Sequence, residues 1–327
     1  MELKYPQGKI VAIGELLVEL VPVQPDLKLN QEGTIIKTAS GSSGIFACAM
    51  AKLCNRAAFI GKMGCDQLSD FLNQIMVREG VDTSHVAKSA DTQIGLAFVE
   101  NLSNGRNFEY YRKGFAGSSF GPDDVDEEFI VKASTIHYSG MLLELSGSMR
   151  AACQKCVKLA RKAGVLVSFD PNIRKELIQD EGARERLLEG VRTADIIAPT
   201  LAEAKYITGL EDIREILKTL HQMGPEFVAL TRDAEGAVVS DGKEIVFIDG
   251  MTVNAIDPTG AGDTFAAMLV YGVQQGWSLE KIAKYCNCAG SLAVTKQGTI
   301  GRALPSLEEV AAFVNQGQCK LKVEKYI

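Results

Sequence analysis

Short apolar segments with the character of β-strands alternate with amphipathic segments with the character of α-helices along most of this sequence. Residues 134–138 and 165–169, for instance, are apolar runs on either side of the helical pattern of residues 146–163. Near the C-terminal part, strand-like residues 227–230 follow helical residues 213–223. This alternation predicts an α/β fold, in which a mostly parallel central sheet is covered by helices on both faces.

Two regions interrupt the alternation, because they hold strand-like pieces with no helix between them. They span about residues 16–39 and 94–112. The second contains Asn104-Gly105, a dipeptide that tolerates positive φ and favours a hairpin turn. We therefore expect one domain over residues 1–327, in which the two insertions form a small antiparallel β lid. Such a lid can close over a ligand and exclude water; a surface decoration or a dimer contact is the alternative.

The charge balance and hydropathy exclude several classes of function. The 327 residues carry 35 Lys and Arg against 41 Asp and Glu, a net charge of −6, which disfavours a general nucleic-acid binder but still allows a local basic pocket. The longest apolar stretch, residues 265–273, is far shorter than the ~20 residues of a membrane span. Glu15 and Glu19 interrupt any signal-peptide pattern. We expect a cytoplasmic protein that binds neither nucleic acid nor membrane.

The most informative motif spans residues 257–267, which follow a strand-like segment and open a helix. Gly260, Ala261 and Gly262 have little or no side chain, so their amides can approach an anion closely at the helix N-terminus. Asp263 stands in the same turn, where a carboxylate can accept a proton from an attacking hydroxyl. Helix capping is the alternative role for Asp263.

Residues 257–267 closely resemble the C-terminal signature of the ribokinase family, also called the PfkB-type carbohydrate kinases. Other segments that resemble the family follow in the same order over nearly the whole chain: residues 13–15, 40–44, 59–66, 169–174 and Glu203. The resemblance implies a ribokinase-like fold, a three-layer α/β/α sandwich with a mostly parallel central sheet and a small β lid made by the two insertions.

The same resemblance implies ATP-dependent phosphorylation of an alcohol group, usually on a sugar. It makes Asp263 the general base, and the amides of Gly260, Ala261 and Gly262 an anion hole for the transferring phosphoryl group. It also implies Mg²⁺, held through water near Glu203, and a monovalent cation such as K⁺ near Asp257 and Thr259. The residues expected to contact the nucleotide are Thr231, Gly236, Gly260, Gly262 and Asn287.

Several positions depart from the family's usual pattern, but none of them is Asp263 or the anion hole. Ile45 stands where a sugar-binding Asn is common, and Thr200 replaces the Asn of an Asn-x-x-Glu element. Met268 replaces a small residue, and Asp233 occupies the place of the first Gly in the nucleotide-contacting turn. Residues 40–43 differ from the usual Gly-Gly-Ala-Pro.

Residues 110–118 resemble a Tyr-Tyr-Arg…Ala-Gly-Ser run of 2-keto-3-deoxygluconate kinases and some fructokinases. Arg112 can donate two parallel hydrogen bonds to a substrate carboxylate, and Arg174 can supply a second set of donors from the sheet edge. Ordinary charge clusters or ion pairs are the alternative for both. The expected substrate-binding residues are Glu19, Gly41, Tyr110, Arg112 and Arg174.

We therefore expect a kinase that phosphorylates a primary hydroxyl of a small sugar or sugar acid, with 2-keto-3-deoxygluconate as the first candidate. Fructose and ribose are the next candidates. A sugar- or nucleotide-binding protein with weak catalysis is the alternative from another class, suggested by Ile45, Thr200 and Asp233. A homodimer built on the lid is compatible with the pattern.

Overall fold

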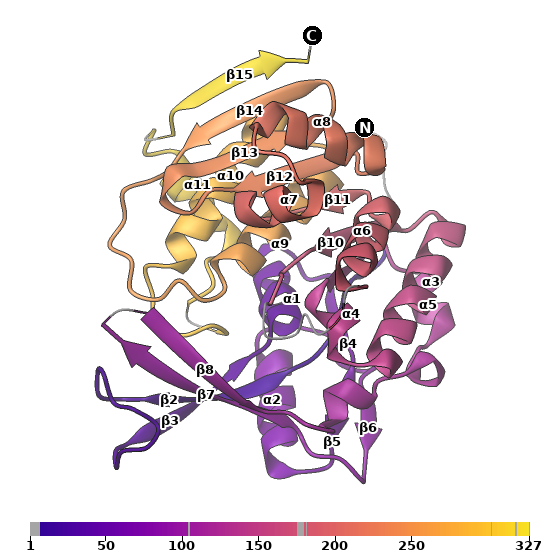
Figure 1. The fold of residues 1–327 in the computed structure, drawn as a ribbon, viewed down its shortest axis with the longest axis vertical. Coiled ribbons are helices and arrows are strands. Elements are labelled where there is room, and N and C mark those ends of the chain that lie inside the picture. The colour runs from indigo at the N-terminus through magenta and orange to yellow at the C-terminus, as the bar shows by residue number, and fades with distance from the viewer. Residues whose placement is uncertain are drawn as a thin grey trace.

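The computed structural model describes residues 7–103, 105–174, 180, 182–301, 303–317 and 319–326, and its centre is a nine-stranded sheet (Figure 1). In spatial order the strands are β15 (Leu321–Lys325), β14 (Glu244–Asp249), β13 (Gly236–Ser240), β12 (Phe227–Thr231), β11 (Ile196–Ile197), β10 (Leu166–Asp170), β9 (Thr135–Ser139), β1 (Ile10–Ile13) and β4 (Ala57–Ile60). Neighbouring strands pair in parallel from β12 to β4, and β12 to β15 pair antiparallel. The expected mostly parallel sheet is confirmed.

Helices cover both faces of this sheet. On one face lie α1 (Ser42–Leu53), α2 (Gln67–Arg78), α9 (Ala261–Gln274), α10 (Leu279–Ala293) and α11 (Leu307–Val314). On the other lie α3 (Glu127–Val131), α4 (Met141–Leu145), α5 (Gly147–Ala163), α6 (Ala183–Thr193), α7 (Leu201–Thr208) and α8 (Ile213–Met223). Short 3₁₀ turns occur at η1 (Ala116–Ser119), η2 (Pro122–Asp124) and η4 (Asp233–Glu235). No helix of the described residues has the length and apolar character that crossing a membrane requires.

Strand β1 illustrates why the sheet is covered on both sides. All four of its side chains are apolar and buried. Ile10 and Ala12 pack with the helix layer that contains α1 and α9, whereas Val11 and Ile13 pack with the layer that contains α5. Successive side chains of a strand point to opposite faces, so a continuous apolar run requires a helix layer on each side.

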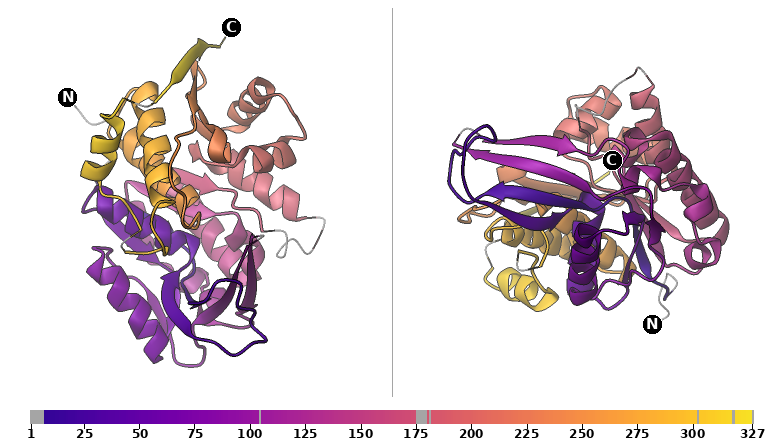
Figure 2. Two further views of the ribbon diagram at one scale, coloured as in Figure 1. Left: turned by 90° about the vertical axis from the view of Figure 1, so that its left-hand side faces the viewer. Right: turned by 90° about the horizontal axis from the view of Figure 1, so that it is seen from below.

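The two insertions form a separate four-stranded lid in the order β3 (Ile35–Ser40), β2 (Leu17–Pro22), β7 (Gly95–Leu102) and β8 (Gly105–Tyr111). The lid projects from the main sheet (Figure 2), as the sequence predicts. One detail differs from the antiparallel lid that we expected, because β2 and β7 pair in parallel while each insertion is an antiparallel hairpin. β2 and β7 are each the first strand of their insertion, and they run in the same direction. The expected turn residue Asn104 lies outside the described residues.

Polar residues gather at the carboxyl ends of the parallel strands. The parallel strands share this edge, and the N-termini of α1 and α9 also line the cavity found there. A second pair of short parallel strands, β5 (Lys62–Gly64) and β6 (Ala87–Ser89), follows β4. Ligands of open α/β sheets bind at the carboxyl ends of strands, so the fold points to the space between this edge and the lid.

Candidate active site

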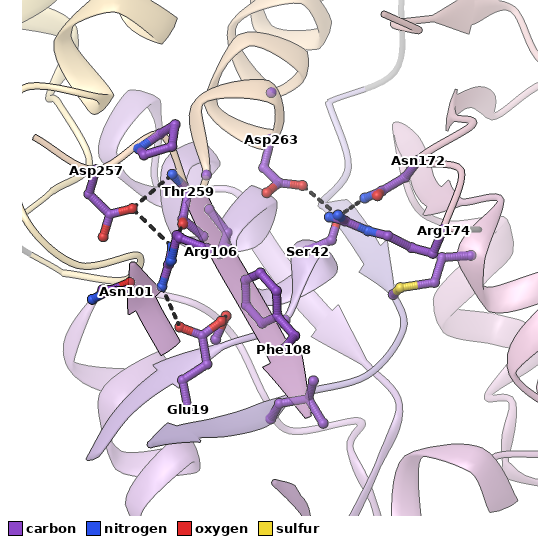
Figure 3. Close-up of a pocket in the computed structure, with 18 of the residues that line it drawn as sticks. Glu19, Ser42, Asn101, Arg106, Phe108, Asn172, Arg174, Asp257, Thr259 and Asp263 are labelled. Atoms are coloured by element: carbon purple, nitrogen blue, oxygen red, sulfur yellow. Dashed lines mark hydrogen bonds and ion pairs between the residues drawn. The ribbon is translucent and has the colours of Figure 1, made fainter. Parts of the chain in front are cut away.

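A cavity of about 1150 Å³ lies between the carboxyl edge of the sheet and the lid. Its lining residues come from segments that are far apart in the sequence, including the lid strands, the start of α1, the end of β10 and the start of α9 (Figure 3). Most of the residues expected at the site line it: Glu19, Gly41, Tyr110, Arg112, Arg174, Glu203, Thr231, Asp257, Thr259, Gly260, Gly262 and Asp263.

The start of α9 brings a cup of backbone amides, those of Gly260 and Gly262, to the cavity. Ala261, the third residue expected there, does not line the cavity, and its N–H donates to the backbone oxygen of Pro258 at 3.3 Å. Gly260 is the N-cap of this helix and has φ 85°, in the left-handed region that favours glycine. A Cβ added to Gly260 would lie 3.0 Å from Cγ2 of Ile45, whereas a Cβ on Gly262 would meet no atom within 4 Å. The first amides of a helix have no intrahelical acceptor and attract anions. The cup is therefore open to the cavity and can hold a phosphoryl group.

Asp263 is held in place by two side chains from other elements. It is 9% exposed, and its Oδ1 accepts a 2.5 Å hydrogen bond from the Ser42 hydroxyl at the start of α1. The Asn172 amide, just after β10, donates to the Ser42 Oγ at 2.9 Å. Because Gly260 is the N-cap, Asp263 is not the capping residue of α9. Its carboxylate instead faces the cavity (Figure 3).

Burial raises the pKa of Asp263 to about 6, while the Ser42 hydroxyl and the positive charge of Arg174 act to lower it. A general base works best when its pKa lies near the operating pH. At neutral pH this carboxylate is mostly ionised, yet it is a stronger base than an exposed aspartate. Asp263 can therefore accept a proton from a bound alcohol.

Replacing Ser42 by alanine should move the acid limb of the pH–activity profile to higher pH. The hydroxyl stabilises the ionised form of Asp263, so its loss raises the carboxyl pKa above about 6 and reduces the ionised fraction near neutrality. A pH profile of kcat/KM for the wild type and S42A measures the shift. An acid limb that stays in place or moves to lower pH would contradict this role for Ser42.

Acidic residues also surround the part of the cavity next to Asp263. Burial and the nearby charges of Glu203 and Asp263 raise the pKa of Asp170 well above its ordinary value. The Glu203 carboxylate accepts the backbone N–H of Ile173 at 2.6 Å and that of Thr200 at 2.8 Å. Oxygen donors and concentrated negative charge suit Mg²⁺, which keeps several water ligands. Within the described part of the chain, no three His, Cys, Asp or Glu side chains are close enough to hold a metal directly, so water and phosphate oxygens would complete its shell.

The end of the cavity next to the lid holds a buried ion pair. Glu15, 1% exposed, accepts a hydrogen bond of 3.1 Å from Nη1 of Arg112. The second carboxylate oxygen, Oε2, has no hydrogen-bond partner among the described residues. Burial raises the pKa of Glu15 to about 7 despite the attraction of Arg112. The Arg112 guanidinium lies 4.0 Å above the Tyr110 ring, which fixes its plane.

Other expected sugar ligands also meet here. Glu19 on β2 is 5% exposed, and the Ser40 hydroxyl donates to it at 2.7 Å. Gly41 has φ 114°, and a Cβ there would lie 2.6 Å from the carbonyl oxygen of Glu15, so only glycine fits.

The Arg174 side chain reaches toward Asp263 and Ser42 (Figure 3). Arg174 forms no ion pair within the part of the chain that the structure describes. Burial raises the pKa values of Glu19, Asp170 and Asp263, and the positive charge of Arg174 opposes this rise.

A lid arginine occupies the oxygens expected to hold a monovalent cation. Asp257 Oδ1 accepts the Thr259 N–H at 3.0 Å and Nη1 of Arg106 at 3.1 Å. The same Nη1 donates to the Thr259 hydroxyl oxygen. Asp257 Oδ2 accepts the N–H of Gly298 at 3.3 Å. With Arg106 in this position, the side-chain oxygens of Asp257 and Thr259 do not fit K⁺.

Two of the expected nucleotide contacts do not line the cavity. Gly236 has φ 99°, and a Cβ on it would lie 2.1 Å from the carbonyl oxygen of Ile248, so its role in the structure is to allow close strand pairing. The Asn287 amide donates to the backbone oxygen of Asp249 at 3.0 Å. For both residues a direct nucleotide contact stays a prediction.

The family departures have local explanations. Thr200 caps α7 in a capping box with Glu203, so a hydroxyl takes the part of the usual amide. Asp233 adopts φ 49°, a left-handed conformation that Asp tolerates better than most residues. Met268 is fully buried in the core. Ile45 lines the cavity beside Gly260 and offers no polar group to a sugar.

Several residues at the site were not among the expected ligands. They are Glu15, Ser42, Arg106, Asp170 and Asn172. Glu15, Asp170 and Asn172 directly follow or end buried strands, which is a signal that the sequence does carry. Ser42 and Arg106 have no such signal, because only packing brings α1 and β8 to the motif of α9.

The profile described as pfkB family carbohydrate kinase matches residues 7–307. The chain belongs to the pfkB family of carbohydrate kinases.

Curated relatives of this carbohydrate kinase include a probable fructokinase-2 of Arabidopsis thaliana, 30% identical over 97% of this chain and 98% of the relative. A 2-dehydro-3-deoxygluconokinase of Bacillus subtilis is 31% identical over 88% and 90% of the two chains. Among solved structures, a putative ribokinase II from E. coli in complex with ATP and Mg²⁺ superimposes with a TM-score of 0.88, at 27% identity over 94% and 99% of the chains. A Vibrio cholerae fructokinase double mutant with fructose, ADP and potassium ion has a TM-score of 0.82, at 25% identity over 95% and 99%.

Proposed function

We propose that this kinase transfers the terminal phosphoryl group of ATP to a primary hydroxyl of a small sugar acid, with 2-keto-3-deoxygluconate as the first candidate. The observation that carries the proposal is that Asp263, the open cup of Gly260 and Gly262, and the cationic Arg174 line one cavity. Together they supply a proton acceptor, an anion site for the phosphoryl group and a positive charge for the sugar substrate.

In the proposed reaction, Asp263 accepts the proton of the attacking hydroxyl, while the amides of the cup stabilise the charge on the transferring phosphoryl group. Ser42 and Asn172 keep the carboxylate oriented toward the cavity. Mg²⁺, when bound with ATP, neutralises phosphate charge, and Glu203 would hold it through water. The lid would exclude water from the reacting groups.

The nucleotide would extend from the cup toward the end of β12, where Thr231 lines the cavity. Gly236 follows the η4 turn, and Asn287 on α10 fixes the backbone of Asp249. We propose that these two residues support the floor of the nucleotide site through the backbone. The phosphates would lie at Gly260 and Gly262.

The positive charge of Arg174 supports an acid sugar. Within the described residues it has no ion-pair partner, whereas its field reaches Glu19 and Asp263. A substrate carboxylate would supply the partner through charge-assisted hydrogen bonds. Arg112, steadied by Glu15 and Tyr110, still has donors to offer to the same group.

A neutral ketohexose such as fructose is the second candidate. Glu15 already pairs with Arg112, which reduces the positive charge available to a carboxylate. The buried carboxylate of Glu19 suits hydrogen bonds from sugar hydroxyls. The Arabidopsis relative, named a probable fructokinase-2, is 30% identical over 97% of this chain.

The test is release of ADP from MgATP with a panel of sugar acids and neutral sugars, including 2-keto-3-deoxygluconate, fructose and ribose. Turnover that is fastest with the sugar acid supports the first candidate, and turnover that is fastest with fructose supports the second. Ligand-induced thermal stabilisation without phosphorylated product would instead favour a binding protein with weak catalysis.

Replacing Arg174 by glutamine should change substrate preference. Hydrogen bonds to charged groups contribute about 1.5–3 kcal/mol each, so kcat/KM for the sugar acid should fall about 10–100-fold more than kcat/KM for fructose. Loss of Arg174 also affects Asp263, but this effect is common to both substrates and cancels in the ratio of their two kcat/KM values. Lys113→Gln, which removes an exposed positive charge just after β8, should leave the ratio unchanged. A ratio unaltered in R174Q would contradict recognition of a carboxylate by Arg174.

A further inference from the structure

Arg106 is the feature of the cavity that neither the phosphoryl transfer nor the sugar recognition explains. It belongs to β8 of the lid, but its guanidinium reaches across to the loop that precedes the anion cup (Figure 3). There it bonds to both Asp257 and Thr259, and Glu19 of β2 lies 4.0 Å from its Nη2. The side chain is only 17% exposed, and its Nε is buried with no partner among the described residues.

The loop held by Arg106 is the direct support of the cup. Ile256 and Asp257 donate their N–H groups to the backbone oxygen of Val294, near the end of α10, at 2.7 and 3.2 Å. Asp257 in turn accepts the N–H of Thr259, the residue before Gly260. The cup geometry therefore depends on a carboxylate whose negative charge has to be balanced in a largely enclosed site.

An alkali cation and a guanidinium can each balance the negative charge of Asp257, but they bind to oxygen atoms in different ways. Both carry a single positive charge, but the cation requires oxygen atoms on several sides, whereas the guanidinium donates directional hydrogen bonds. Here Asp257 Oδ1 and the Thr259 hydroxyl oxygen both face Arg106, and Oδ2 faces the N–H of Gly298. A potassium ion on the same oxygens would lie next to a like charge that never deprotonates.

We propose that Arg106 supplies the positive charge at Asp257 from within the chain, so that this kinase works without a monovalent cation. The inference rests on the carbohydrate kinase activity, but not on which sugar is phosphorylated. The Vibrio cholerae fructokinase double mutant, by contrast, has been solved in a potassium ion-bound form.

The positive charge at Asp257 thus comes from a residue of the lid. Arg106 of β8 joins the lid to the body of the protein, because it hydrogen-bonds to Asp257 and Thr259 in the loop before the cup. Arg106 is a positioning residue: it acts on the phosphoryl group through the loop and touches no reacting atom.

The experiment compares wild-type protein, Arg106→Ala and Lys37→Ala in potassium, sodium or tetramethylammonium chloride at equal ionic strength. Lys37 is a matched control, because it is a lid cation that lies over the Phe71 ring at 4.4 Å, away from Asp257. Three quantities are measured in each salt: the unfolding midpoint with ADP bound, which needs no sugar, and kcat and KM for ATP.

Wild type and K37A should show the same midpoint in all three salts and turnover that varies less than about twofold. R106A should lose turnover about 10–100-fold, as expected for a misplaced cup. Potassium, or guanidinium added well below denaturing concentrations, should restore much of this loss and raise the R106A midpoint, whereas tetramethylammonium should not.

Three results would overturn the proposal. The first is a wild-type unfolding midpoint that rises by several degrees, or a wild-type turnover that rises severalfold, in potassium alone. The second is an R106A variant with normal turnover. The third is an impaired R106A variant that neither potassium nor guanidinium rescues. If no sugar in the panel is phosphorylated, the midpoints with ADP still decide the question, so a wrong substrate is not confused with a wrong cation.

Discussion

Asparagine in place of Asp263 should lower kcat by about 10²–10⁴-fold, the usual size of a lost acid–base role. The amide has nearly the same shape, and its oxygen can still accept the Ser42 hydroxyl that now holds Oδ1 at 2.5 Å. It cannot take a proton from the attacking alcohol, because an amide is not basic near neutral pH. The substitution therefore removes the chemistry while the packing around α9 stays intact.

Affinity for ATP should change little in D263N, since the cup amides at Gly260 and Gly262 are untouched. Calorimetry of nucleotide binding and steady-state kinetics together make this measurement. Asp70→Asn is a suitable control, because Asp70 is an exposed acid in the first turn of α2. Full turnover in D263N would show that another group accepts the proton.

A single methyl group at Gly262 should be nearly as damaging. A Cβ at this position meets no protein atom within 4 Å, and Gly262 lines the cavity, so the methyl enters the space meant for the phosphoryl group. We expect kcat/KM for ATP to fall about 10²–10³-fold, similar to the loss of one oxyanion donor. Stability should move in the opposite direction, because alanine is favoured over glycine in a helix by up to about 1 kcal/mol.

Gly147→Ala tests whether the effect is specific to the cup. Gly147 is the first residue of α5, and a Cβ there also meets no atom within 4 Å. G147A should therefore retain activity and gain similar stability. Thermal unfolding and ATP kinetics on both variants are sufficient; G262A with normal KM and kcat would mean that the phosphates bind elsewhere.

Local signals were enough to predict the layers of the fold and to single out Asp263 and the small residues before it as candidates for the site. Apolar runs such as that of β1 specify strands buried on both faces, and small residues before Asp263 specify an open helix N-terminus. Both are properties of contiguous residues, since a strand's pattern and a helix's first turn are written in a few neighbouring positions. The pairing of β2 with β7 in parallel was not predicted, because it depends on how two distant insertions meet.

What surrounds that core was decided by tertiary structure. Ser42 and Asp263 are separated by 221 positions, and Arg106 and Asp257 by 151, yet each pair is joined by a hydrogen bond. The pairing of Arg112 with Glu15 likewise arises only when the lid meets the end of β1. A sequence motif fixes which group can react, because that depends on the residue's own chemistry. The charges that surround and balance this group depend on distances through space. These distances are set only when the helices, the sheet and the lid have packed together.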